Sequence, residues 1–121
     1  SPWDVDVVVA DGRTFAGIDG GYDRVLLDAP CTGLGALRRR PEARWRRSPD
    51  DIAELAILQR ELLAAALRLV RPGGVVAYVT CSPHPAETNA IVAGHELIAP
   101  AHQWWPHRHG TDAMFLALLH A

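Results

Sequence analysis

The segment VLLDAPCTG, residues 25–33, begins as an apolar strand and ends in a carboxylate, a proline and a thiol. A second segment, VVAYVTCSP at residues 75–83, repeats this order and also contains a thiol at its end. Short apolar runs that stop at a proline are typical of buried strands in a parallel sheet. Ligands bind outside the carboxyl ends of such strands, so we expect the two cysteines to face one cleft.

Around these two strands the sequence alternates between strand and helix patterns. VDVVVAD (5–11) predicts another buried strand, and MFLALLHA (114–121) predicts a final one. From Ser48, a Ser-Pro-Asp-Asp start and apolar residues at three- and four-residue spacing predict a long helix. The Pro-Gly-Gly of residues 72–74 is expected to end this helix.

Two less regular segments follow the second thiol. AETNAIVAGHEL (86–97) predicts a shorter helix that Pro100 ends, and HQWWPHRHGTDA (102–113) predicts a loop. The resulting order is strand, loop, strand, long helix, strand, helix and strand. This order is that of an α/β fold with a mostly parallel sheet.

One element of such a fold is not found in this sequence. A nucleotide-binding α/β sheet normally has a Gly-rich turn that follows its first strand and opens a helix. Gly17, Gly20 and Gly21 instead lead into a strand, so a surface turn is the preferred interpretation. We therefore expect residues 1–121 to be the later part of a larger domain whose N-terminal strands are missing. The unpaired strand edge would let the isolated chain self-associate or rearrange.

Composition limits the class of protein. The chain has 121 residues, is 49% hydrophobic and carries a net charge of −2, which indicates one globular unit without a strong overall field. No apolar run approaches the roughly 20 residues that span a bilayer, so no membrane contact is expected. Two cysteines and no signal-peptide pattern indicate a reducing, cytoplasmic setting.

Each reactive group also has a purely structural interpretation. A buried cysteine is commonly just a small hydrophobic residue, which applies to Cys31 and to Cys81. Asp28, before Ala-Pro, would serve equally well to cap a turn. Structural zinc would need two further ligands, and the candidate histidines lie in the 102–113 segment without a second cysteine pair. We therefore expect no metal.

The paired motifs extend well beyond the two thiols. DAPCTG followed by RRRPEARW, a helix with LQRELL, then RPGG and YVTCSPHPAET resembles the RNA 5-methylcytosine methyltransferases of the NOL/NOP/Sun family, and most of all its bacterial 16S rRNA (RsmB/Fmu-like) branch. The similarity runs from about Asp11 to the end of the chain, with Thr32 where serine is more usual. The resemblance implies the C-terminal portion of a Rossmann-like, S-adenosyl-L-methionine-dependent methyltransferase fold that acts on RNA, with rRNA expected.

The resemblance also implies roles for individual residues. The nucleophile of the family is the cysteine of the TCS motif, here Cys81, and the cysteine of DAPC, here Cys31, aids release of the methylated product. A thiolate that adds to C6 of cytosine makes C5 able to accept a methyl group. Asp28 matches the carboxylate beside the methionine end of the cofactor and the target base, where it can carry a proton. Asp11 matches an acidic position that hydrogen-bonds the adenine portion.

An arginine-rich segment follows the first thiol directly. All 12 basic residues of the chain are arginines, and six of them lie in LRRRPEARWRR (37–47). Guanidinium groups bind phosphates and aromatic rings stack on bases, so the segment is expected to bind RNA. The residues proposed for this contact are Arg38, Arg39, Arg40, Arg44 and Trp45. The alternative is a solvated charged loop with its tryptophan packed in the core.

The family's Gly-rich cofactor loop and its N-terminal RNA-binding domain are not in residues 1–121. On its own, this chain is therefore expected to bind the cofactor poorly and to lack activity, although it carries the chemical half of the site. Two other functions remain open: a non-catalytic RNA-binding or assembly module that keeps the methyltransferase fold and, more weakly, a dithiol redox protein.

Overall fold

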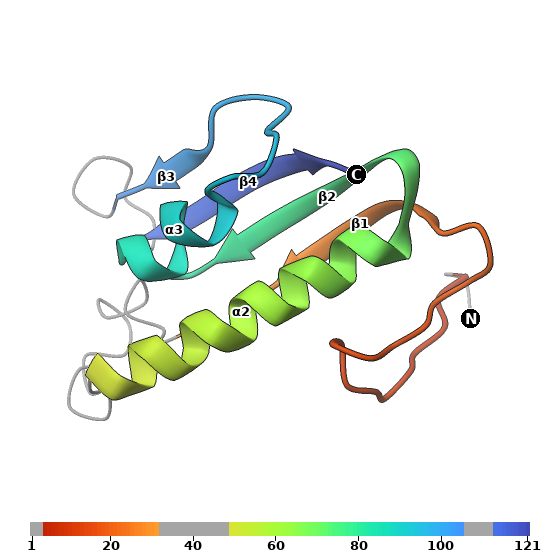
Figure 1. Cartoon of the computed structure of the whole chain (residues 1–121), viewed down its shortest axis with the longest axis horizontal. Helices are drawn as coiled ribbons and strands as arrows, with labels where there is room; N and C mark the ends of the chain where they lie inside the picture. The colour runs from red at the N-terminus through yellow and green to blue at the C-terminus, as the bar shows by residue number, and fades with distance from the viewer. Residues whose placement is uncertain (1–3, 32–48, 106–112) are drawn as a thin grey trace.

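The computed structural model describes residues 4–31, 49–105 and 113–121. The described elements are, in order, β1 (Tyr22–Asp28), α2 (Pro49–Leu69), β2 (Val70–Thr80), the 3-10 helix η2 (Pro85–Glu87), α3 (Asn89–Val92), β3 (His102–Trp104) and β4 (Met114–His120). The strands form one sheet in the order β1-β2-β4-β3, and α2 and α3 lie on one face of it (Figure 1). The predicted α/β class is confirmed.

The pairing of the strands differs in part from the sequence expectation. β1 and β2 are parallel, whereas β2 with β4 and β3 with β4 are antiparallel. These four strands therefore do not form a mostly parallel sheet. A parallel pair needs a long crossover, which α2 and the residues before it supply between β1 and β2. Residues 105–113, between β3 and β4, are enough only for an antiparallel return.

The long helix predicted from Ser48 is α2. Pro49 is its first residue, Asp50 and Asp51 lie in its first turn, and Arg68 lies in its last turn. This distribution of charge complements the helix dipole. Four of the buried side chains of the helix recur at the predicted three- and four-residue spacing, namely Ala56, Gln59, Leu63 and Ala66, and Ala65 is buried beside them.

The end of α2 comes earlier than predicted. The helix ends at Leu69, and residues 72–74 form an irregularity within β2, where the register with β1 shifts. Gly74 is needed there because a Cβ atom would lie 2.7 Å from the carbonyl oxygen of Asp23 and would also overlap the Val70 side chain. The Pro-Gly-Gly segment thus shapes the entry into β2 rather than stopping the helix.

The buried strand predicted at residues 5–11 is wrong. These residues are exposed and lie outside any strand, and Val9 is 100% exposed. A strand needs a partner for its backbone hydrogen bonds, and the described residues place no strand beside this segment. The residues that follow run along α2 instead, where Arg13 forms an ion pair with Glu61.

Two later predictions also need correction. The helix predicted at 86–97 is reduced to η2 and to the four residues of α3, and the chain turns at Gly94, whose φ is +83°. Pro100 therefore does not mark the helix end. The segment predicted as a loop from residue 102 begins with β3, because Gln103 pairs with Phe115 and tertiary pairing overrides its weak local pattern.

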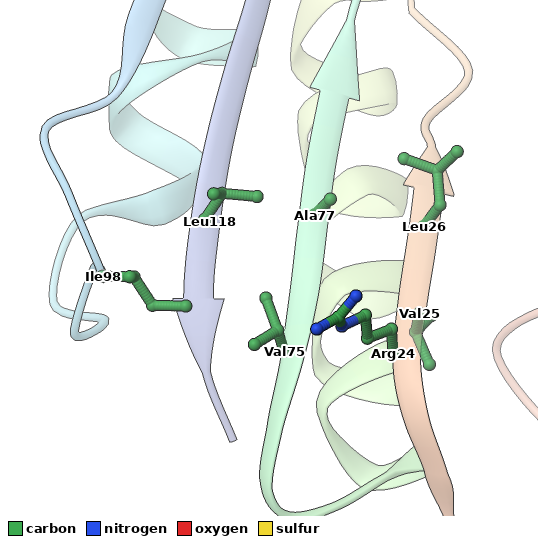
Figure 2. A pocket seen from close by; sticks show the side chains of 7 residues that line it. All are labelled: Arg24, Val25, Leu26, Val75, Ala77, Ile98 and Leu118. Carbon is green, nitrogen blue, oxygen red and sulfur yellow. The ribbon is translucent and has the colours of Figure 1, made fainter.

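The two faces of the sheet are covered differently. Alternate residues of β2 and β4 pack against the helices in the main core, which includes Leu63, Val76, Tyr78, Ile91, Phe115 and Leu119. The opposite face carries an open apolar groove of about 430 Å³ between β1, β2 and β4, with Val75, Ala77 and Leu118 in its wall (Figure 2). Leu26 at the outer strand is 70% exposed. Within the described residues, the outer edge of β1 has no partner strand.

Candidate active site

The parallel pairing of β1 and β2 brings the two cysteine segments to the same edge of the sheet. Asp28 lies opposite Val79, and the N–H of Ala29 donates to the carbonyl oxygen of Val79 at 3.0 Å. Cys31 comes three residues after the end of β1, and Cys81 directly follows the end of β2. Both cysteines are half-buried, and they are not joined by a disulfide. The predicted common edge is thus observed, with the Asp28 carboxylate exposed at it.

A buried polar bridge joins the two segments. Gln59 of α2 donates through Nε2 to the carbonyl oxygen of Pro30 at 2.8 Å and to Oε1 of Glu87 at 3.3 Å. The hydroxyl of Ser82 donates to the other carboxylate oxygen of Glu87. Gln59, Ser82 and Glu87 are each 0% exposed. The bridge therefore runs from the residue before Cys31 to the residue after Cys81.

The segment after Cys81 is held by further hydrogen bonds. The N–H of His84 donates to Ser82 Oγ at 3.1 Å, and the N–H of Ala86 donates to His84 Nδ1 at 3.1 Å. The hydroxyl of Thr88 donates to the carbonyl oxygen of His84 at 3.1 Å. These contacts fix the backbone that carries the second thiol.

Tyr78 links this segment to the core. Its hydroxyl donates to the carbonyl oxygen of Glu87 at 2.9 Å, and its ring meets Phe115 edge-on. Burial raises the pKa of the Tyr78 hydroxyl well above its ordinary range, and the charges of Glu87 and Cys31 raise it further. The tyrosine is therefore a neutral donor at physiological pH, and Cys31 lies within electrostatic reach of it.

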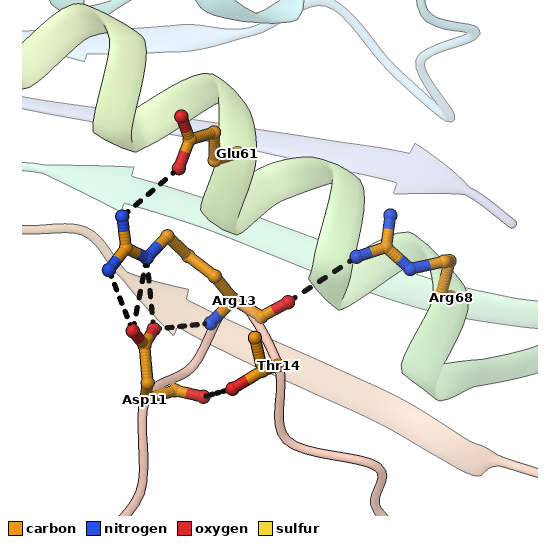
Figure 3. A network of polar contacts seen from close by, with 5 residues as sticks. All are labelled: Asp11, Arg13, Thr14, Glu61 and Arg68. Carbon is orange, nitrogen blue, oxygen red and sulfur yellow. Dashed lines mark hydrogen bonds and ion pairs between the residues drawn. The ribbon is translucent and has the colours of Figure 1, made fainter.

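Asp11 belongs to a separate network on the outer side of α2 (Figure 3). Its carboxylate accepts from the Arg13 guanidinium at 2.7 and 3.0 Å and from the Arg13 N–H at 2.9 Å. The side-chain hydrogen bonds from Arg13, followed by the backbone one, lower the pKa of Asp11 to about 2. Arg13 also reaches Glu61 at 3.2 Å, and Arg68 donates to the Arg13 carbonyl oxygen at 3.5 Å. The Asp11 carboxylate is thus ionised and already has a cationic partner.

Sequence reasoning missed Gln59 and Glu87. Gln59 interrupts the apolar face of α2, and a polar side chain at a core position must find a hydrogen-bond partner. A polar residue within the apolar face of the helix can be recognised in the sequence. The hydrogen-bond partners of Gln59, which are Pro30 and Glu87, belong to two other segments and depend on the tertiary fold.

The remaining predicted groups fall outside what the structure tests. The arginine-rich residues proposed for RNA contact, Arg38, Arg39, Arg40, Arg44 and Trp45, lie outside the described residues.

Among residues 4–31, 49–105 and 113–121, no three His, Cys, Asp or Glu side chains gather closely enough to hold a metal ion. No helix in that part of the chain combines the length and apolar character needed to cross a membrane.

Known proteins resemble this chain in sequence and in fold. A putative methyltransferase of Mycobacterium tuberculosis is 57% identical over 95% of this chain, which spans 30% of that relative. The ribosomal RNA small subunit methyltransferase B of Sodalis glossinidius is 48% identical over 73% of this chain and 21% of its own length. NSun6 from Pyrococcus horikoshii, solved with SFG, has a TM-score of 0.81 and 31% identity over 95% of this chain and 34% of that one.

These relatives confirm the predicted resemblance and the predicted part of a Rossmann-like methyltransferase fold. The chain spans about 30% of the length of the Mycobacterium tuberculosis relatives. The family model for the 16S rRNA methyltransferase RsmB/F matches residues 3–97. Since that match covers well over half of the 121 residues, the chain belongs to the RsmB/F family of 16S rRNA methyltransferases.

Proposed function

We propose that this chain is the catalytic portion of an S-adenosylmethionine-dependent RNA methyltransferase that modifies C5 of a cytosine, with 16S rRNA as the expected substrate. The observation that carries the proposal is the parallel register of β1 and β2, which gathers Asp28, Cys31 and Cys81 at one sheet edge. The family match supports an rRNA substrate. A cytoplasmic location is part of the proposal. The arginines at 38, 39, 40 and 44, with Trp45, contact the RNA in this proposal.

The two thiols divide the chemistry between them. Cys81, as a thiolate, adds to C6 of the cytosine and makes C5 nucleophilic. The bound cofactor supplies the methyl group that C5 accepts. Cys31, as a thiolate, assists release by accepting the C5 proton; the electron pair of that C–H bond restores the C5–C6 double bond, the C6–S bond breaks, and the Cys81 thiolate leaves. Asp28 exchanges a proton with the pyrimidine edge and stabilises the adduct.

Two exposed carboxylates suit parts of the cofactor: Asp28 lies at this edge, whereas Asp11 lies in the separate network beside α2. The exposed Asp28 carboxylate is a suitable acceptor for the ammonium of the methionine end. Asp11 is ionised and exposed, so it is able to accept hydrogen bonds from the adenine portion, in competition with Arg13. The SFG in the Pyrococcus horikoshii relative is an analogue of S-adenosylmethionine and supports this class of cofactor. The 121 residues alone contain no Gly-rich cofactor loop, so we expect them to bind the cofactor weakly and to be inactive.

The test traps the covalent adduct on RNA. The full-length protein that contains this chain is incubated with rRNA carrying 5-fluorocytosine, whose fluorine blocks the final elimination, and the cross-linked residue is mapped by mass spectrometry. We expect Cys81→Ala to form no adduct. On unmodified RNA, Cys31→Ala is expected to accumulate one, because release is slowed. Normal turnover by both variants would overturn the roles of the thiols, and RNA binding without any methyl transfer would favour the non-catalytic module.

A further inference from the structure

The bridge of Gln59, Glu87 and Ser82 is built at an energetic disadvantage. Full burial takes the Glu87 carboxyl group and the Gln59 amide out of water, which costs free energy that their hydrogen bonds must offset. Oε1 of Gln59 is buried and has no hydrogen-bond partner. Apolar side chains of similar size would fill the same space without these losses. Stability alone is therefore a poor explanation for the three polar side chains.

The connectivity of the bridge suggests a different role. Gln59 binds the carbonyl oxygen of Pro30, which is covalently next to Cys31. Ser82, which is covalently next to Cys81, binds Glu87. The single contact between Gln59 and Glu87 closes the path between the two segments. Beyond the last paired residues of β1 and β2, this path is a direct side-chain link between the two thiol-bearing turns.

We propose that Gln59 and Glu87 are positioning residues that set the separation of the Cys31 and Cys81 thiols. This inference rests on the proposed function and deepens it. Two thiols that act in turn on one base must both reach that base, so their separation matters for the reaction. Hydrogen bonds are directional, so the bridge fixes this separation more narrowly than apolar packing would. Neither residue touches the base; each acts through the turn that it holds.

The experiment measures the separation of the thiols chemically. In the full-length protein, with cysteines outside this chain replaced by serine, bismaleimides of graded spacer length cross-link Cys31 to Cys81, and the yield for each spacer is read by mass spectrometry. The native protein is expected to show a narrow optimum. Glu87→Ala and Gln59→Leu break the bridge, and we expect the yield at that optimum to fall roughly tenfold while longer spacers gain. Gln59→Leu keeps most of the side-chain volume, which guards against simple misfolding.

Two further variants separate positioning from a general loss of structure. Glu87→Gln retains an acceptor for Gln59 and places an amide donor toward Ser82, so it should restore the native spacer optimum. Glu54→Ala, on the exposed side of the same helix, should leave the profile unchanged. If the profile of Gln59→Leu and Glu87→Ala matches that of the native protein while their melting temperatures fall, the bridge is only structural and the inference fails.

The same variants distinguish this inference from the proposed function. A changed spacer profile in a protein whose cysteines never form an RNA adduct would leave positioning intact and end the methyltransferase assignment of the thiols. Normal adduct formation with an unchanged spacer profile would support the roles of the thiols in methyl transfer and would contradict the positioning role of Gln59 and Glu87. When both hold, Gln59→Leu is expected to lower kcat about tenfold with little change in KM for RNA, because binding is intact and only the approach of the thiols is altered.

Discussion

Tyr78→Phe tests the energetics of the turn that carries Cys81. The substitution removes one hydroxyl from a fully buried ring and leaves its packing against Phe115 in place, so no cavity forms. The substitution removes the 2.9 Å hydrogen bond from the Tyr78 hydroxyl to the carbonyl oxygen of Glu87. This buried oxygen then no longer has the tyrosine as a donor. A buried hydrogen bond of this kind contributes about 1–2 kcal/mol to the free energy of unfolding.

The pH dependence of this difference has a definite sign. The pKa of Tyr78 is raised on folding above its value of 10.0 in the unfolded chain, so the folded state holds its proton more tightly. The resulting stability is fully present below pH 10 and is lost as pH rises above 10 toward the higher folded pKa. Phenylalanine has no such proton. The advantage of the native protein over Tyr78→Phe should therefore shrink above pH 10.

Urea denaturation, followed by circular dichroism at pH 8 and at pH 11, is carried out on the full-length protein and on its Tyr78→Phe variant. It measures the difference in free energy of unfolding between the two proteins and the change of this difference with pH. Other titrating groups are common to the two proteins and cancel in the difference. A difference below about 0.5 kcal/mol at pH 8 would show that the hydroxyl contributes little. A difference that stays constant or grows at pH 11 would refute the inference that burial and the charges of Glu87 and Cys31 hold the proton in place.

Two other predictions concern the frame of the sheet. Gly74→Ala should destabilise the protein by roughly 1–3 kcal/mol, because its Cβ would press on the Asp23 carbonyl oxygen and on Val70, and an unchanged melting temperature would show that the register shift relaxes easily. The isolated 121-residue chain should self-associate through the outer edge of β1, and Leu26→Lys should reduce the association whereas the exposed control Glu54→Lys should not. Sedimentation measures this; a monodisperse monomer that binds the cofactor with full affinity would contradict it.

The sequence predicted the parts of the fold that depend on local pattern. The helix from Pro49, the strands that precede both thiols and their common edge follow from apolar spacing, a proline start and the rules of parallel sheets. Residues 5–11 were misjudged because an apolar run predicts a strand only when a neighbour is available for pairing. β3 was missed for the converse reason: its three residues are a strand because β4 lies beside them.

The candidate site divides in the same way. Cys31, Cys81 and Asp28 were predictable because each lies at the end of a strong strand pattern. The partners of Glu87 were not, since Gln59 is 28 residues away in the chain and its role appears only when α2 packs on the sheet. The Arg13 contact to Asp11 is local, but the extension to Glu61 again depends on how the segment runs along the helix.

The side chains of β2 alternate between the two faces of the sheet, so the residues that hold the turn and the residues that line the groove are separate sets. Val76, Tyr78 and Thr80 point to the helix side, where the polar bridge and the tyrosine hydroxyl hold the turn after Thr80. Val75 and Ala77 line the groove on the other side. Replacements in the groove wall should therefore leave the scaffold of the thiols unaltered. In an engineered variant, the groove and the turn that carries Cys81 should be adjustable one at a time.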